Sequence, residues 1–425
     1  MKRSFNFISS ALLLAACATH SAHAAFPDFA ALPVRAEMPD PLVMLGGTQV
    51  KTRAQWEKER RPELKEMFLH YMYGQISPKP EKMETTVIGE YHDFLGGTAT
   101  LKLIALQAGP GNGPRIDLML IVPNERRAPA PVFLAMDFCG NDALTDDPRV
   151  PLPKSWVGNR CPGCVNGVAT EASRGSQATN WPLAEIVRRG YALATFYSGD
   201  IDSDRKDVSS GIYKWLAGSD SAKNKPEDRG TLAAWAWGFH RCVDYLVTEP
   251  SVDKHRIATV GHSRNGKTAL IAAAFDERIA IAFPHQAGCG GSAPSRGKTG
   301  ESVKAINDSF PHWFNAEFKK FNGAPDRLPF DQNSLVALCA PRPVLFSCAE
   351  GDQWANPAGQ FEVLKAAEPV YKFLGADGLG VTKAPGFRQL VGGRLGYYIR
   401  EGKHSMTADD WKVFMDFADK NWKSP

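Results

Sequence analysis

The sequence predicts an α/β protein with a mostly parallel, doubly wound sheet between two layers of helices. Apolar, strand-like runs alternate with helical segments over most of the chain, as is typical of a parallel sheet covered on both faces. In residues 256–275, "RIATVGHSRNGKTALIAAAF", a buried strand, a tight turn and an apolar helix follow one another. With 425 residues, the chain can bury a large core, and we expect residues 25–425 to form one domain.

Local patterns predict the individual elements in chain order. Residues 53–73 form a charged amphipathic helix, and residues 98–106 and 115–123 are strands, the second ending at Pro123. The continuous apolar run in residues 130–142 suits a buried central strand. Further helices are expected over residues 182–190, 230–249 and 265–275, and further strands over residues 191–197, 256–263, 279–288, 341–352 and 395–405.

A loop-rich tract interrupts this alternation at residues 143–179. It contains many Pro, Gly, Ser and Asn residues. A long tract without regular structure inside a globular chain is either disordered or functional. We interpret it as an insertion that walls a site.

The N-terminus reads as an export signal over residues 1–24. Lys2 and Arg3 precede an uncharged apolar stretch, and Ala22-His-Ala24 offers a cleavage site. The stretch is too short for a membrane span. Leu14-Ala-Ala-Cys17 also fits a lipobox, in which Cys17 would carry a lipid anchor. Both routes place the protein outside the cytoplasm, as a secreted or periplasmic protein or an outer-membrane lipoprotein.

Charge and cysteine content exclude several classes of function. The formal net charge of +4 is too small, and too evenly spread, to predict nucleic-acid binding. Cys161-Pro-Gly-Cys164 has CxxC spacing, but no second CxxC completes a zinc site and no thioredoxin-like pattern surrounds it. We expect a structural disulfide staple or free thiols at these two cysteines. We also expect the protein to use no metal and no cofactor and to be a monomer.

Ser263 is the candidate nucleophile. It lies at the turn between the predicted strand and helix, with Gly261 before it and Gly266 after it. Such a turn holds a serine in a strained conformation with its hydroxyl exposed, and the helix N-terminus offers N–H groups to a developing oxyanion. The alternative is a serine that merely caps the helix.

A nucleophilic serine needs a base and an acid, and α/β-hydrolases supply them in the order serine, acid, histidine. His404 follows the last predicted strand, where the base is expected, whereas His285 lies inside a strand and His312 in a mid-chain loop. For the acid we predict Asp352, in the loop after residues 341–349, with Glu350 as the alternative.

The motif "GHSRNGK" resembles the nucleophile motif of glucuronoyl esterases, carbohydrate esterase family 15, whose usual form is Gly-Cys-Ser-Arg-x-Gly-Lys. Further likeness to bacterial members lies in "RGSQATNWPLAEIVRRGYALATFYSGDID", "GTLAAWAWGFHRCVDYL", "HQAGCGGSA", "PRPVLFSCAEGDQWANPAGQF" and "REGKHSM", over most of the chain from about residue 90. The resemblance implies an α/β-hydrolase fold and cleavage of esters between (4-O-methyl-)glucuronic acid on xylan and lignin alcohols.

The resemblance also implies roles for four further residues. Arg264 would contribute to the oxyanion hole, Lys267 would bind sugar hydroxyls, and Glu301 and Trp354 would line the glucuronate pocket. The spacing agrees, because Lys267 lies one helical turn after Ser263 on the same face.

The chain departs from the family pattern at two positions. His262 replaces the usual cysteine before the nucleophile, and Gln286 stands where many members carry the glutamate of the triad. An amide cannot stabilise an imidazolium as a carboxylate does, which favours Asp352 as the acid. Gln286 is then expected to be a substrate-binding residue that makes hydrogen bonds nearby.

Two other functions remain open from the sequence. One is an acetyl or feruloyl xylan esterase on the same fold. The other is a catalytically inactive carbohydrate-binding homologue, in which Ser263 would have no chemical role.

Overall fold

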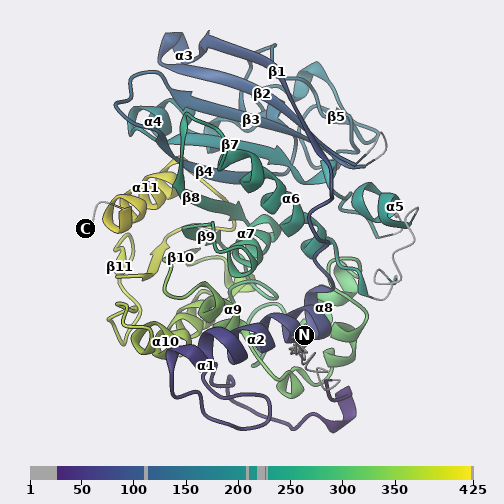
Figure 1. Cartoon of the computed structure of the whole chain (residues 1–425), viewed down its shortest axis with the longest axis vertical. Coiled ribbons are helices and arrows are strands. Elements are labelled where there is room, and N and C mark those ends of the chain that lie inside the picture. The colour runs from purple at the N-terminus through teal and green to yellow at the C-terminus, as the bar shows by residue number, and fades with distance from the viewer. Residues whose placement is uncertain (1–25, 110–112, 207–209, 218–224, 226–227, 423–425) are drawn as a thin grey trace, which may run out of the picture.

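The computed structural model describes residues 26–109, 113–206, 210–217, 225 and 228–422 (Figure 1). The predicted leader, residues 1–24 with Cys17, lies outside the described residues. Within the described part of the chain, no helix is both long and apolar enough to cross a membrane.

The described strands form a ten-stranded sheet in the order β1-β2-β3-β7-β4-β8-β9-β10-β12-β11. Its centre, from β7 to β12, is parallel, and antiparallel pairs extend both edges. This confirms the predicted mostly parallel sheet. The strands are β1 Met83–Asp93, β2 Ala99–Ala108, β3 Arg115–Pro123, β4 Ala130–Asp137, β7 Ala192–Tyr197, β8 Val252–His262, β9 Ile281–His285, β10 Val344–Ala349, β11 Val391–Gly392 and β12 Leu395–Arg400.

Helices cover both faces of the sheet, as the alternating sequence pattern predicts (Figure 1). Along β4, Val132 and Leu134 pack in the core beneath α6, α7, α9 and α10, whereas Phe133 and Ala135 pack beneath α4 and α11, because successive strand residues point to opposite faces. The helices are α1 Arg53–Gln55, α2 Arg61–Phe68, α3 Phe94–Gly97, α4 Leu183–Arg188, α5 Gly211–Ala217, α6 Thr231–Leu246, α7 Arg264–Phe275, α8 Val303–Ser309, α9 Gln332–Cys339, α10 Pro357–Phe373 and α11 Ala408–Trp422.

The helix expected over residues 53–73 is present, but it is not uniformly α-helical. Its α-helical parts, α1 and α2, alternate with π-helical turns at Trp56–Arg60 and Leu69–Tyr73. Thr52 begins it with a capping box, in which the Thr52 hydroxyl accepts from the N–H of Gln55 and the Gln55 side chain accepts from the N–H of Thr52.

The tract over residues 143–179 contains short helical turns and a two-stranded hairpin, β5 Cys164–Val165 with β6 Val168–Ala169. Of the two expected outcomes at the CxxC, a local Cys161–Cys164 staple does not form, and Cys164 is a free thiol. Cys161 instead forms a disulfide with Cys139, just after β4. The chain enters the hairpin at Cys164, whereas the Cys161 sulfur lies 3.3 Å from the carbonyl oxygen of Phe138. The disulfide therefore ties this tract to the carboxyl end of the central strand β4.

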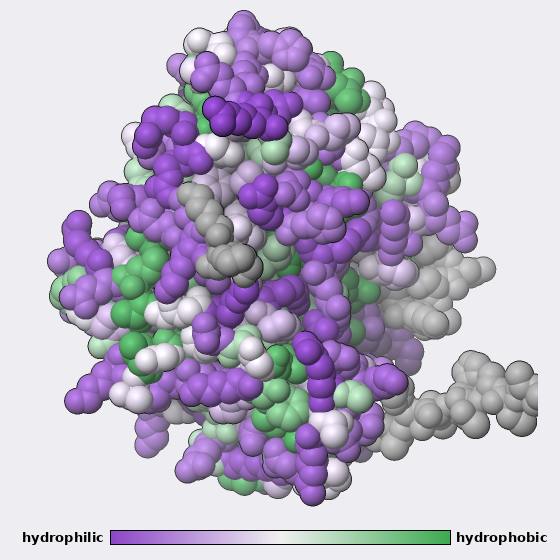
Figure 2. Space-filling model, turned by 60° about the vertical axis from the view of Figure 1, so that its left-hand side comes forward, coloured by the Kyte–Doolittle hydropathy of each residue, from purple (hydrophilic) through white to green (hydrophobic). Residues whose placement is uncertain are grey.

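The surface in Figure 2 is mainly hydrophilic, with apolar residues in small groups. Isolated apolar side chains are normal on a soluble protein, so only those beside a site need an explanation. The large exposed apolar side chains of the described chain are Val34, Val87, Ile88, Phe138, Val165, Val168, Trp354 and Phe387. Phe138 follows β4 and Trp354 follows β10, and β8, the strand that precedes the candidate nucleophile, lies between these two strands in the sheet.

Candidate active site

Ser263 lies in a strained turn between β8 and α7. Its backbone has φ 58° and ψ −124°, a conformation that costs a non-glycine residue about 1–3 kcal/mol and is common at functional sites. Its N–H donates to the carbonyl oxygen of His285 over 2.9 Å. Within this fully described segment, the Ser263 hydroxyl makes no capping hydrogen bond to α7, so helix capping does not explain the serine.

Two glycines make this turn sterically feasible. A Cβ atom on Gly261 would lie 2.1 Å from the carbonyl oxygen of Asn265, and one on Gly266 would lie 2.7 Å from the carbonyl oxygen of Gly261. Both distances are shorter than a real Cβ atom tolerates. A glycine is therefore required three residues after Ser263, where the first turn of α7 packs against the backbone oxygens of Gly261 and His285.

The predicted base and the predicted acid are in contact. Asp352 Oδ2 accepts a hydrogen bond from His404 Nδ1 over 2.7 Å. Asp352 is 5% exposed, and the His404 side chain is 42% exposed. Glu350 lies on the surface and, within the described chain, makes no hydrogen bond to His404. The geometry thus favours Asp352 over Glu350.

Ser263 and His404 follow the carboxyl ends of β8 and β12, which lie on the same side of the parallel sheet. Among the described residues no hydrogen bond joins the Ser263 hydroxyl to His404. Such contacts are often long in a free enzyme and shorten when substrate is bound.

Two further histidines lie behind the base. The ring of His262 lies 4.4 Å from that of His404 and 5.1 Å from that of His285. Burial lowers the pKa of His262 well below its usual value, and the neighbouring His285 and His404 lower it further. His262 is therefore neutral at neutral pH and places no second charge beside the base.

Gln286 supports the backbone next to His404. Its Oε1 accepts from the N–H of Ser405 over 2.9 Å. Its Nε2 is buried and has no hydrogen-bond partner among the described residues. His285 is also buried and is used structurally, with Nδ1 2.6 Å from the hydroxyl of Ser347 and Nε2 2.9 Å from the carbonyl oxygen of Ser405.

Arg264 forms an ion pair with Asp204, a residue that the sequence reasoning missed. Its guanidinium lies over the rings of Phe310 and Trp313, at 5.0 and 4.7 Å from their centroids. Burial alone would raise the pKa of Asp204, but hydrogen bonds from His312 and Trp313 and the charge of Arg264 lower it to about 2. Asp204 lies in the loop after the carboxyl end of β7. Because sites of parallel sheets form at these strand ends, this position could have identified Asp204 as a candidate site residue.

Lys267 faces the same Trp313 ring as Arg264, with Nζ 5.9 Å from the ring centroid, and Glu301 and Trp354 belong to the neighbouring loops. Lys267 Nζ is buried and donates to the carbonyl oxygens of Ala287 and Cys289 over 2.5 and 2.7 Å. Burial lowers its pKa, and the charge of Glu301 opposes this. The N–H of Glu301 donates to the carbonyl oxygen of Trp354 over 2.9 Å, and Trp354 is 60% exposed. Lys267 thus also holds the loop after β9, which its predicted role did not include.

No group of three or more His, Cys, Asp or Glu side chains in the described part of the chain could hold a metal ion. A strained serine, a histidine bound to a buried carboxylate, and an arginine at the start of α7 thus stand at the carboxyl ends of the parallel strands, and these are residue types that serine hydrolases use.

Known proteins are similar to this chain in both sequence and fold. The family model "Glucuronyl esterase, fungi" matches residues 180–375. "Carbohydrate esterase MZ0003", from an unknown prokaryotic organism, is 42% identical over 385 residues, which cover 90% of this chain and 89% of that protein. The 4-O-methyl-glucuronoyl methylesterase of Cerrena unicolor is 26% identical, over 84% of this chain and 65% of that protein.

Two solved structures superpose closely on this chain. A promiscuous CE15 esterase from a marine bacterial metagenome has a TM-score of 0.85 and 41% identity, over 93% of this chain and 99% of that one. The glucuronoyl esterase from Solibacter usitatus has a TM-score of 0.85 and 35% identity, over 92% of this chain and 100% of that one. On this sequence and structural similarity, the chain belongs to the glucuronoyl esterases of carbohydrate esterase family 15, carboxylic ester hydrolases with an α/β-hydrolase fold.

Proposed function

We propose that this chain hydrolyses esters between the (4-O-methyl-)glucuronic acid side chains of xylan and lignin alcohols. The reaction would proceed through an acyl-enzyme on Ser263. His404 would be the general base, and the Asp352 carboxylate would be the triad member that orients His404. The observation that carries the proposal is the 2.7 Å hydrogen bond between His404 Nδ1 and the buried Asp352 carboxylate, at the edge of the sheet where Ser263 stands in its strained turn.

In the first step, His404 Nε2 takes the proton of the Ser263 hydroxyl while Oγ attacks the uronate carbonyl carbon. The resulting oxyanion is stabilised by N–H groups at the start of α7 and by the Arg264 guanidinium. Collapse of the tetrahedral intermediate breaks the bond to the alcohol oxygen, and that oxygen takes the proton from His404. A water molecule then repeats the sequence on the acyl-enzyme, giving the free uronate and restoring Ser263.

The uronate would lie on the side of Lys267, Glu301 and Trp354. Lys267 Nζ keeps one N–H beyond the two that it donates to carbonyl oxygens, and this N–H is available to a sugar hydroxyl. Trp354 offers an exposed apolar ring face for sugar C–H groups. Gln286 would act indirectly, by fixing Ser405 beside the base.

The acid half of the substrate distinguishes this proposal from an acetyl or feruloyl xylan esterase. We would compare kcat/KM on benzyl glucuronate, p-nitrophenyl acetate and methyl ferulate. A preference for the uronate ester is expected, and Lys267→Met should lower kcat/KM on that ester more than on acetate. Equal losses on both esters, or a preference for acetate or ferulate, would refute the uronate assignment. The absence of turnover on all three esters would instead favour the inactive carbohydrate-binding homologue.

Export completes the proposal. It rests on the sequence pattern of residues 1–24. Mass spectrometry of the N-terminus of the exported protein would distinguish cleavage after Ala24 from lipidation of Cys17.

A further inference from the structure

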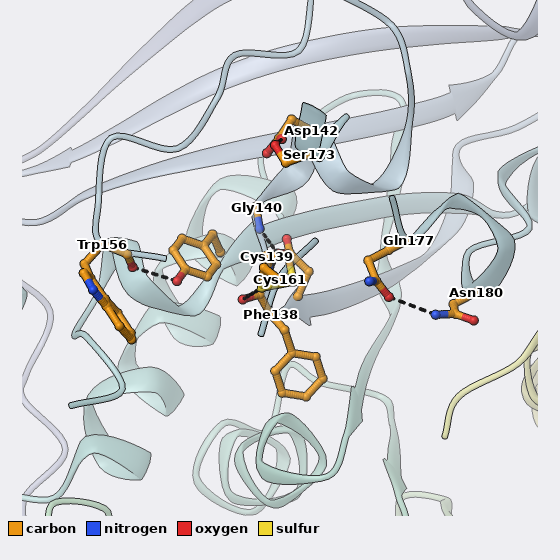
Figure 3. The surroundings of a disulfide bond; sticks show 11 residues. Phe138, Cys139, Gly140, Asp142, Trp156, Cys161, Ser173, Gln177 and Asn180 are labelled. Atoms are coloured by element: carbon orange, nitrogen blue, oxygen red, sulfur yellow. Dashed lines mark hydrogen bonds between the residues drawn. A yellow bond between two sulfur atoms is a disulfide. The ribbon is translucent and has the colours of Figure 1, made fainter. Parts of the chain in front are cut away.

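Three cysteines come together where the tract over residues 143–179 meets the end of β4. Cys139 and Cys161 form the disulfide, and Cys164 is a free thiol three residues after Cys161. Figure 3 shows the disulfide beside Phe138, the exposed residue that follows β4. The CxxC pair of the sequence thus consists of one disulfide-bonded cysteine and one free thiol, and the function proposed above uses neither.

Residues 161–164 form a tight turn whose shape also allows a disulfide between its two ends. The N–H of Cys164 donates to the carbonyl oxygen of Cys161 over 3.2 Å. Pro162 and Gly163 occupy the two corners, and Gly163 has φ 75°. Proline followed by a glycine with positive φ is typical of a type II turn, which keeps its two end Cα atoms within about 7 Å. Disulfides join Cα atoms about 4.4–6.8 Å apart, so Cys164 can reach Cys161 without a large movement of the backbone.

Cys164 differs from the other free cysteines in its surroundings. It is only half-buried, and it packs against the apolar cluster that contains Cys139 and Cys161. The other free cysteines of the described chain are all buried: Cys242, Cys289, Cys339 and Cys348. Cys164 is therefore the free thiol that both lies against the disulfide region and has access to solvent.

The protonation state of Cys164 controls how fast it can react. Burial raises the pKa of this thiol, and the charge of Asp142 adds to the rise. Tyr197 is coupled to the same thiol and is neutral at neutral pH, because burial raises its pKa as well. A disulfide is attacked by a thiolate and not by a thiol, so little Cys164 is reactive at neutral pH. Below the pKa of Cys164, the reactive fraction grows about tenfold for each unit of pH.

The backbone that the disulfide holds is connected to the candidate base through two ring contacts. The Cys161 sulfur lies 3.3 Å from the carbonyl oxygen of Phe138. The Phe138 ring meets the His262 ring edge-on, with centroids 6.2 Å apart, and the His262 ring lies 4.4 Å from that of His404. A change of disulfide partner at Cys161 therefore acts on a segment that packs against the catalytic histidine through His262.

We propose that these cysteines form a thiol–disulfide switch, in which the disulfide moves from Cys139–Cys161 to Cys161–Cys164 and the tract over residues 143–179 loses its covalent tie to β4. The Cys164 thiol gives up its proton, and its sulfur bonds to the Cys161 sulfur. The bond between Cys139 and Cys161 breaks, and Cys139 leaves as a thiolate that takes up a proton. One disulfide and one thiol exist before and after the step, so it needs no oxidant and no reductant. The untied form should be the less active one, because Phe138 loses its fixed support.

The first test maps the disulfide and does not depend on catalysis. Protein kept for several hours at pH 7 or pH 9 is quenched with acid and unfolded, its free thiols are blocked with N-ethylmaleimide, and peptide mapping by mass spectrometry locates the blocked cysteines. Uncatalysed disulfide rearrangement takes minutes to hours, so at pH 9 a fraction of the wild type should carry the label on Cys139 and not on Cys164. In Cys164→Ser, Cys139 should stay unlabelled at both pH values. An unlabelled Cys139 in the wild type at pH 9, or equal labelling in Cys164→Ser, would overturn the proposal.

The second test fixes each of the two forms in a single variant. Cys164→Ser keeps the Cys139–Cys161 disulfide and cannot exchange it. Cys139→Ser, oxidised with glutathione disulfide, should close the Cys161–Cys164 bond, and mapping should find neither cysteine labelled. Two labelled thiols in oxidised, folded Cys139→Ser would show that the turn does not close and would refute the switch. Circular dichroism checks the fold, and if Cys139→Ser does not fold, the mapping of the wild type decides.

The third test measures the effect of the switch on the active site. At pH 7, kcat/KM on benzyl glucuronate should be the same for Cys164→Ser as for the wild type. Oxidised Cys139→Ser should be slower by at least about threefold, since a displacement of about 1 Å at a catalytic group can cost about a hundredfold. Equal values for the two variants would remove the link between the disulfide and catalysis. The proposed function is tested separately, because it fails only if the wild type does not cleave the uronate ester, whatever the mapping shows.

Discussion

Replacing Asp352 by asparagine removes the charge that faces His404 and leaves the shape of the side chain almost unchanged. In the wild type the carboxylate accepts the Nδ1–H hydrogen bond over 2.7 Å, which holds the ring in the tautomer whose Nε2 can act as base. It also stabilises the imidazolium that forms in the transition state. An amide can do neither reliably, because its NH₂ group can turn to Nδ1 and favour the wrong tautomer.

The magnitude follows from the separation and the exposure of the pair. Two unit charges 2.7 Å apart attract by about 1.5 kcal/mol in bulk water and by about 6 kcal/mol at an effective dielectric constant of about 20. Because Asp352 is buried and His404 is half exposed, the loss lies between these limits. At about 1.4 kcal/mol per factor of ten, with the tautomer effect added, kcat should fall by about 10²–10⁴-fold in Asp352→Asn.

The assay is steady-state hydrolysis of benzyl glucuronate, with Glu350→Gln as the matched control. Glu350 is exposed and lies two residues from Asp352 in the same loop, so its substitution should change kcat by no more than about twofold. The reasoning is refuted if Glu350→Gln loses more than a hundredfold while Asp352→Asn keeps nearly full activity.

Three further predictions address the neighbouring contacts. Asp204→Ala should lower kcat/KM by at least about tenfold, since Arg264 loses the anion that orients it; unchanged kinetics would remove Asp204 from the site. Gly266→Ala should lower the melting temperature, because its Cβ would lie 2.7 Å from a backbone oxygen, whereas Gly323→Ala meets no atom within 4 Å and should not; similar melting temperatures in thermal scans would contradict the steric account. The buried Asp202 has its pKa raised to about 7 by burial, so the folded state holds its proton more tightly than the unfolded state and this contribution to stability is lost as pH rises from about 4 through 7. Asp202→Asn should therefore unfold at a higher denaturant concentration than the wild type at pH 8 but not at pH 4, and equal differences at the two pH values would disprove this.

The central part of the fold could be predicted because its signals are local. The strand before Ser263 and the helix after it are both strongly apolar, and the tight turn between them needs its glycines. The loops after β10 and β12 carry Asp352 and His404 in the order that the fold requires, so their contact could be expected from topology alone.

The parts that the sequence did not predict depend on contacts between distant segments or on exposed edges. Strand β1 pairs with β2 at the edge of the sheet, and most of its side chains are exposed, so it carries little hydrophobic pattern. The ion pair of Arg264 with Asp204 joins residues sixty positions apart. The partner of Cys161 depends on how the tract over residues 143–179 folds back onto β4. No local pattern records any of these contacts.

The most direct test of the central claim is the hydrolysis of benzyl glucuronate by the wild type and by Ser263→Ala, at equal concentration and with the folded state of both checked by circular dichroism. The wild type should release benzyl alcohol and glucuronate, and Ser263→Ala should lose activity by a factor on the order of 10⁶, as serine hydrolases do without their nucleophile. Turnover by Ser263→Ala at a rate close to that of the wild type would contradict the account.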